Sequence, residues 1–109
     1  MCNINVVFTK RKSGDVTSYL ASATSHSFVH NDDGEGVYLS NSDELIKSKT
    51  KINYFDLREG FEKSKAIITH QRYSTSGYEL EFNHPFVNDN FVMVHNGVIN
   101  QFRETNGSD

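Results

Sequence analysis

The sequence predicts one domain of the α+β class, and three observations support this. Its 109 residues suffice for one domain, because domains cluster at about 100–150 residues. Segments rich in β-branched residues recur along the chain, and a stretch with helical spacing of apolar residues lies between two of them. An aromatic content of 12% with one proline is typical of a folded chain rather than a disordered one.

The first half of the chain is expected to be mainly extended. Residues 4–9 predict a strand that stops at a turn signal around Gly14, and residues 16–21 predict the return strand of a hairpin. A polar loop over residues 26–36 follows, and residues 37–39 resume a strand.

Two helices and two further strands are expected in the second half. Asp43 can cap a short helix over residues 43–51, whose lysines suit a helix end. Residues 56–65 carry Leu57 and Phe61 four apart on one face, although Gly60 weakens this second helix. Buried strands are predicted at residues 66–69 and 91–94, each followed by a polar cluster.

Composition excludes several classes of function. The net charge is −3, with 11 basic against 14 acidic residues, so we expect no nucleic-acid partner. No apolar run is long enough to span a bilayer, and basic residues follow residues 4–8, the reverse of a secretory signal. Cys2 is the single cysteine, which excludes an internal disulfide. These features predict a cytoplasmic protein without a membrane partner.

Cys2 is a candidate nucleophile. Removal of Met1 would leave a thiol and a free α-amine on one residue, and an α-amine with a pKa of about 7.7–8.0 can take the proton of the thiol. The resulting thiolate is the reactive form. The alternative is that Cys2 is a small apolar residue that only packs, as most free cysteines do.

A second candidate group is the polar cluster over residues 69–77. Arg72 offers a planar guanidinium that can grip a carboxylate through two parallel hydrogen bonds, as an amino-acid substrate would require. The alternative is a surface arginine paired with an acidic residue.

A third group comprises residues 83–86 and 94–100. Asn96 and Gly97 together form a common turn pair, and they also supply an amide donor and an unhindered backbone N–H that could face an oxyanion. Both interpretations are compatible.

A zinc site is a further alternative. It would use Cys2 with His70, His84 and His95, since thiolate and imidazole are normal zinc ligands. The compact spacings of zinc motifs are absent, so we expect neither a metal nor a cofactor.

Taken together, these motifs resemble the class II, or N-terminal nucleophile, glutamine amidotransferase domain. The resemblance rests on Cys2, on residues 70–77, 83–85 and 94–99, and on the loop at residues 31–37, all in the same order as in that family. Within the family, His70-x-Arg72 is similar to the branch that aminates sugar phosphates.

The resemblance implies a fold and a reaction. The fold is a four-layer αββα sandwich of antiparallel sheets, truncated at its C-terminal end, with residues 1–109 forming an N-terminal portion or a compact version of the domain. The reaction is attack of Cys2 on the side-chain amide of glutamine, which gives a γ-glutamyl thioester and ammonia. A synthase domain or subunit would receive the ammonia, and the chain could form homo- or hetero-oligomers.

The resemblance also implies roles for individual residues. Asn96 and the N–H of Gly97 would form the oxyanion hole, and Arg72 would bind the α-carboxylate of glutamine. His84 would organise a loop. The pocket wall would be formed by Tyr73, Thr75 and Ser76.

Three departures from the family pattern stand out. Asn3 replaces a glycine and is expected to narrow the approach to the nucleophile, and Tyr73 stands where a tryptophan is common. Asp109 resembles the aspartate that binds the substrate α-amine, at a shorter distance from Asn96 than is usual. Two alternatives therefore stay open: a non-catalytic binding or regulatory module that pairs with another chain, and a thiol hydrolase acting on a different amide.

Overall fold

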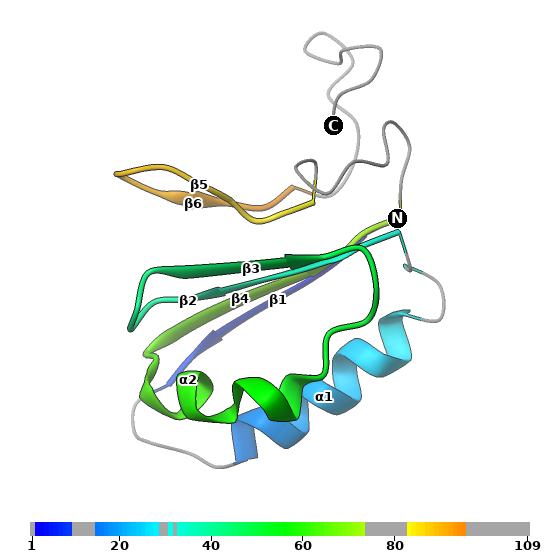
Figure 1. Ribbon diagram of the computed structural model, residues 1–109, viewed down its shortest axis with the longest axis horizontal. Helices are drawn as coiled ribbons and strands as arrows, with labels where there is room; N and C mark the ends of the chain where they lie inside the picture. Colours follow the sequence, from blue (N-terminus) through cyan, green and yellow to red (C-terminus); the bar gives the residue numbers. More distant parts are fainter. Residues whose placement is uncertain (1, 10–14, 29–30, 32, 74–82, 96–109) are drawn as a thin grey trace, which may run out of the picture.

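The structure is a computed structural model, and it describes residues 2–9, 15–28, 31, 33–73 and 83–95. Over these ranges the chain is α+β with antiparallel sheets (Figure 1). The elements follow in the order β1 (Asn3–Phe8), α1 (Asp15–Phe28), β2 (Glu35–Leu39), β3 (Glu44–Ser48), η1 (Tyr54–Leu57), α2 (Arg58–Lys63), β4 (Ala66–Gln71), β5 (Phe86–Val87) and β6 (Val92–Met93).

The described strands form a four-stranded sheet and a two-stranded ribbon. The sheet has the order β1-β4-β2-β3, and every neighbouring pair in it is antiparallel. Helices α1 and α2 cover one face of the sheet, and the β5–β6 ribbon lies over the other face (Figure 1). This layering of helices, sheet and ribbon is consistent with part of a sandwich.

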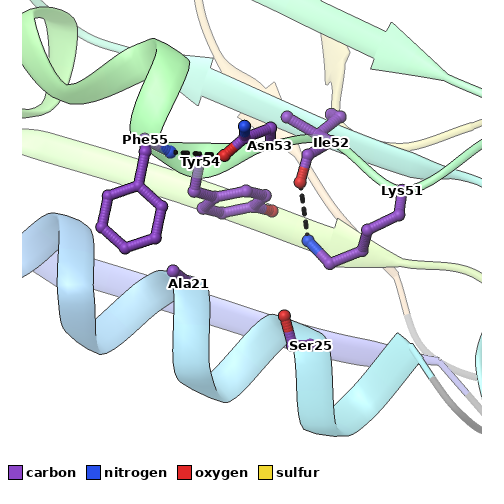
Figure 2. Close-up of a pocket in the computed structure, with 7 residues that line it drawn as sticks. All are labelled: Ala21, Ser25, Lys51, Ile52, Asn53, Tyr54 and Phe55. Atoms are coloured by element: carbon purple, nitrogen blue, oxygen red, sulfur yellow. Dashed lines mark hydrogen bonds between the residues drawn. The ribbon is translucent and has the colours of Figure 1, made fainter.

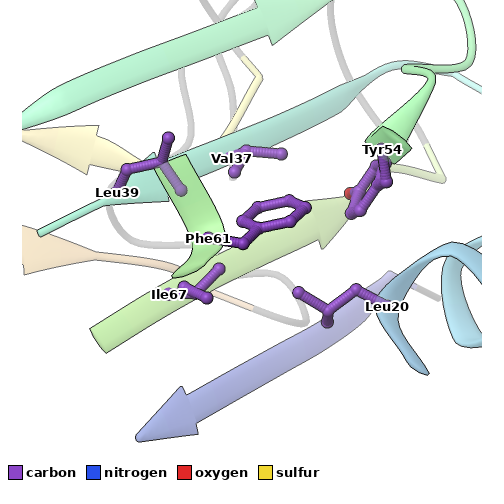
Figure 3. Packing of buried hydrophobic residues seen from close by; sticks show 6 residues of the cluster. All are labelled: Leu20, Val37, Leu39, Tyr54, Phe61 and Ile67. Atoms are coloured by element: carbon purple, nitrogen blue, oxygen red, sulfur yellow. The ribbon is translucent and has the colours of Figure 1, made fainter. Parts of the chain in front are cut away.

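The apolar core lies between the sheet and the helices (Figure 3). Side chains alternate across a strand, so every second residue of β2 and β4 faces the helices. The aromatic rings of Tyr54 and Phe61 pack against each other with centroids 5.7 Å apart. The fully buried apolar residues are Leu20, Val37, Leu39, Tyr54, Phe61 and Ile67.

Several predicted elements are confirmed. Strands occupy the predicted positions at β1, β2 and β4, and β4 continues as far as Gln71. The helix predicted over residues 56–65 is present as η1 followed by α2, which ends at Lys63. These segments combine a contiguous or regularly spaced apolar pattern with clear polar boundaries, which is why the local sequence was sufficient.

The predicted return strand over residues 16–21 is wrong, because these residues belong to helix α1. The buried residues Thr17, Leu20 and Thr24 recur at helical spacing and face the core, whereas Tyr19 is exposed. The short apolar pattern of residues 16–21 also fits a strand, and packing of this segment on the sheet selects the helix.

Two other predictions need correction. Residues 43–51 do not form a helix: Asp43 is a turn residue with a φ of 50°, and β3 follows it and pairs with β2. The strand near residues 91–94 is reduced to β6, and it is not buried, since Phe91 and Met93 are exposed. In both places a short apolar run fits more than one structure, and strand pairing decides between them.

Candidate functional site

The pairing of β1 with β4 brings two of the predicted site segments together. Asn3, the first residue of β1, lies opposite Gln71, the last residue of β4. Cys2 therefore lies beside the residues that follow β4, and its Sγ is 3.7 Å from the carbonyl oxygen of Tyr73. The thiol is partly exposed, and Tyr73 is exposed. Residues 71 positions apart in the sequence thus meet at one end of the sheet.

Arg72 is buried at this end of the sheet, with 4% of its surface exposed. Its backbone N–H donates to the carbonyl of Gly34 at 2.8 Å, and its own carbonyl accepts from the N–H of Asp33 at 2.8 Å. These bonds anchor Arg72 to the loop before β2. The interpretation of Arg72 as a solvent-exposed arginine is therefore wrong.

Two buried histidines hold the backbone of a third. Nδ1 of His84 accepts the backbone N–H of His95 at 3.0 Å, and Nε2 of His70 lies 3.2 Å from the carbonyl oxygen of His95. Because a carbonyl only accepts, Nε2 of His70 carries the proton in this contact. The rings of His70 and His84 pack with centroids 4.3 Å apart.

Burial keeps both of these imidazoles neutral. The pKa of His70 is lowered to about 4, mainly by burial; the hydrogen bond to His95 opposes this shift, and the charges of Arg72 and His95 add to it. Burial likewise lowers the pKa of His84 to about 3, with additional contributions from His70, His95, Arg72 and Lys47. At neutral pH these rings serve as fixed hydrogen-bonding groups rather than as cations.

The histidines do not assemble a metal site in the part of the chain that the structure describes. No group of three or more His, Cys, Asp or Glu side chains suited to a metal ion occurs there. His70 and His84 instead direct ring nitrogens at the backbone of His95.

The side chain of Asn3, which replaces a glycine of the family pattern, is hydrogen-bonded to the neighbouring strand. Its side-chain Nδ2 donates to Oε1 of Gln71 at 2.8 Å, on the face of the sheet that the helices cover. The side chain is thus tied to β4, and its effect on the approach to Cys2 stays a prediction.

Glu35 is a buried acidic residue that the sequence analysis did not identify. It is 0% exposed, and its carboxyl group accepts hydrogen bonds from Gln71, Tyr54 and the backbone of Ile52. Its position between two glycines in a polar loop suggested an exposed residue. The available signal was its parity with Val37 and Leu39, which places it on the core-facing side of the same strand.

The remaining predicted site residues cannot be placed. Thr75, Ser76, Asn96 and Gly97 lie outside the described residues, as does Asp109. His95, the last described residue before Asn96, is the one that His70 and His84 hold.

A cavity of about 260 Å³ lies elsewhere, between α1 and the segment that leads into η1 (Figure 2). None of the predicted site residues lines it. The Lys51 ammonium at its edge donates to the carbonyl of Ile52 at 2.7 Å. The lining residues are Ala21, Ser25, Lys51, Ile52, Asn53, Tyr54 and Phe55.

Over the described residues, no helix is long and apolar enough to cross a membrane.

Comparison with known proteins identifies a distant relationship. The chain is 30% identical, over an alignment of 111 residues, to glutamine–fructose-6-phosphate aminotransferase (isomerizing) of Sulfurisphaera tokodaii. The alignment covers 95% of this chain and 19% of that protein, so the chain spans about a fifth of the length of its relative. No family model matches the chain. A comparison with solved structures gave no significant match. The chain is thus distantly related to an aminotransferase that is named for glutamine and fructose 6-phosphate.

Proposed function

We propose that this chain is a class II glutamine amidotransferase domain that releases ammonia from glutamine with Cys2 as the nucleophile. The observation that carries the proposal is the antiparallel register of β1 and β4, which brings Cys2 beside Arg72 and Tyr73. The sequence predicts Cys2 as the nucleophile and Arg72 as the carboxylate-binding group, and the location of both residues at one end of the sheet supports this pairing. The distant relationship to a glutamine-dependent enzyme supports the same reaction.

The reaction divides into two steps. After removal of Met1, the α-amine of Cys2 takes the proton of the thiol, and the thiolate attacks the side-chain carbonyl carbon of glutamine. The C–N bond breaks as the nitrogen receives the proton held by the α-amine, so that ammonia leaves and a γ-glutamyl thioester remains. Water then attacks the thioester, which releases glutamate and restores the thiol.

Substrate binding and charge stabilisation are assigned to other residues. The guanidinium of Arg72 binds the α-carboxylate of glutamine, and Tyr73, Thr75 and Ser76 form the pocket wall. Asn96 and the N–H of Gly97 stabilise the oxyanion of the tetrahedral intermediate, a contribution for which one donor is worth about 10²–10³ in rate. His84 supports this part of the site through the hydrogen bond to His95.

The proposal extends to the domain and its partner. Residues 1–109 form the N-terminal portion or a compact version of an N-terminal nucleophile fold with αββα layers. The ammonia passes to a synthase domain or subunit, which accords with the greater length of the aligned relative.

Intact mass spectrometry tests the proposal. The purified protein is incubated with a diazo-ketone analogue of glutamine, with and without free glutamine. We expect loss of Met1 and a single adduct on Cys2, which free glutamine suppresses. Retention of Met1, or an unlabelled Cys2 in folded protein, would overturn the proposal.

A non-catalytic module that pairs with another chain is the second candidate. Among the described strands, β1 is at the edge of its sheet, and Val6 and Phe8 on it are exposed, Phe8 to 79%. Such an edge is suited to pairing with a further strand. An unlabelled Cys2 together with a concentration-dependent increase in mass by light scattering would favour this candidate.

A further inference from the structure

Glu35 is the centre of a buried hydrogen-bond network on the helix-covered face of the sheet. Its Oε1 accepts the backbone N–H of Ile52 at 2.7 Å and lies 3.4 Å from the ammonium of Lys51. Its Oε2 accepts the hydroxyl of Tyr54 at 2.9 Å and the amide of Gln71 at 2.7 Å. The carboxyl group thus joins β2, β4 and the segment that enters η1.

The network continues from Glu35 to the start of β1. Nε2 of Gln71 donates a hydrogen bond to Glu35, and Oε1 of Gln71 accepts one from Nδ2 of Asn3 at 2.8 Å. Gln71 immediately precedes Arg72, and Asn3 immediately follows Cys2. The last two members of the network are therefore the chain neighbours of the two residues to which we assign carboxylate binding and nucleophilic attack.

The direction of each hydrogen bond follows from Glu35. An ionised carboxylate only accepts, so Gln71 must turn its NH₂ toward it. The carbonyl oxygen of the same amide then faces β1, where it can only accept a hydrogen bond, and the NH₂ group of Asn3 donates it. The position of the Glu35 carboxyl group thereby sets which atoms of Gln71 and Asn3 meet.

We propose that Glu35 is a positioning residue, which through Gln71 and Asn3 sets the position of Cys2 relative to Arg72. The inference rests on the proposed glutaminase function. A nucleophile displaced by about 1 Å can lose up to about 10²-fold in rate. Disruption of the network should therefore lower kcat for glutamine and change KM little, since the guanidinium of Arg72 itself is retained.

The most direct test reverses the two network partners. Glu35→Gln removes the carboxylate that orients Gln71. In the double variant Glu35→Gln with Gln71→Glu, the new amide at position 35 donates to the new carboxylate at position 71, which can still accept from Asn3. We expect the single variant to lower kcat about tenfold or more, and the reversed pair to recover at least half of the loss on a logarithmic scale. A kcat for Glu35→Gln within twofold of the original would overturn the proposal.

A second pair of variants does not depend on a change in the core. Asn3→Ala removes the last link, and Asn5→Ala is its matched control, because Asn5 donates to Thr69 at 3.2 Å across the same two strands, two residues farther from Cys2. Both should lower the melting temperature by similar amounts, whereas only Asn3→Ala should lower kcat, by about fivefold or more, with KM within twofold. Equal kcat values for the two variants would overturn the proposal.

A readout without glutamine separates this inference from the proposed function. The rate at which iodoacetamide alkylates Cys2 is measured for the original chain, Asn3→Ala and Asn5→Ala. We expect a change of threefold or more for Asn3→Ala alone. If the original chain does not hydrolyse glutamine, the proposed function fails, and this rate still decides whether the network controls Cys2; equal rates in all three proteins would show that it does not.

Discussion

His84 holds His95 by its backbone: Nδ1 of the buried His84 ring accepts the N–H of His95 at 3.0 Å. The acceptor exists only while the ring is neutral, because a protonated imidazole has a donor at both nitrogens. The bond lies one residue before Asn96, to which we assign a share of the oxyanion hole. Protonation of His84 would therefore release the segment that leads into this part of the proposed site.

The first prediction concerns pH and stability. The folded-state pKa values of His70 and His84 are about 4 and about 3, below the ordinary value of 6.5. The unfolded chain therefore binds more protons than the folded chain as the pH falls below 6.5, so stability is retained above that pH and lost below it. At pH 5 each ring should cost about 2 kcal/mol of unfolding free energy.

Urea unfolding at pH 7.5 and pH 5 measures this effect. His84→Asn supplies a side-chain oxygen to accept from His95 but does not titrate, and it should lose about 2 kcal/mol less than the original chain between the two pH values. His26→Gln is the matched control, because His26 is exposed on α1, and it should keep the full pH dependence. The prediction fails if His84→Asn and His26→Gln have the same pH dependence.

The second prediction concerns the carboxylate of the substrate. Arg72→Lys keeps the positive charge and loses the planar fork that forms two parallel hydrogen bonds. If Arg72 binds the α-carboxylate, kcat/KM for glutamine should fall about 10²-fold in Arg72→Ala and less in Arg72→Lys, in line with a charged hydrogen bond worth about 1.5–3 kcal/mol.

A comparison of substrates completes this test. A primary amide of the same length as glutamine, but without the α-carboxylate, should be hydrolysed at similar rates by the original chain and by Arg72→Ala. The melting temperature is recorded for both variants, since Arg72 is buried. An equal loss for both substrates would assign Arg72 to the structure of the site rather than to carboxylate binding.

The third prediction concerns the free α-amine of Cys2. Retention of Met1, or the addition of one residue before Cys2, should abolish glutamine hydrolysis and leave the melting temperature unchanged, because the amine becomes an amide that cannot accept the thiol proton. Mass spectrometry establishes the N-terminus and an ammonia assay measures turnover. Undiminished turnover with Met1 in place would rule out the α-amine as the base.

The fourth prediction concerns the contact between β2 and the segment before β5. A Cβ added at Gly36 would lie 1.7 Å from the backbone carbonyl oxygen of His84, and backbone cannot yield as a side chain can. Gly36→Ala should therefore destabilise the chain by more than about 2 kcal/mol and separate residues 83–85 from the sheet.

Gly60→Ala is the matched control for this prediction. Its added Cβ would meet the side chain of Leu39, whose flexible end, Cδ1, would lie at 2.7 Å. Alanine also has a helix propensity about 0.8–1.0 kcal/mol more favourable than glycine, so the two effects oppose each other within α2. Urea unfolding should rank Gly36→Ala well below Gly60→Ala in stability, and the reverse order would contradict the packing described for Gly36.

Parts of the fold could be predicted because their signals are local. Residues 66–69 combine β-branched residues in a run that fits a buried strand, and Leu57 and Phe61 are spaced for one face of a helix. In α1, by contrast, Leu20 lies among small and polar residues that fit a strand or a helix equally well. The sheet against which Leu20 packs selects the helix, and this sheet is built from segments distant in the sequence.

The candidate site divides in the same way. Cys2, Arg72 and His84 could be named as candidates from the sequence, because residue type and the order of motifs carry that information. Glu35 was missed, because an acidic residue between two glycines fits an exposed loop, and its parity with Val37 and Leu39 was the one local signal against this. Its burial results from the pairing of β2 with β4 and from the donors of Tyr54 and Ile52 that converge on it.

The sequence by itself determined which chemical groups this protein carries and the order in which they occur. The tertiary structure alone decided which of them meet: it brought Cys2 to Tyr73 through the register of β1 and β4, and it buried His70 and His84 together. The physical reason is that hydrogen-bond register and burial depend on segments far apart in the chain. Local propensity carries no information about these distant segments. Their pairing sets both the distances and the pKa values of the candidate site.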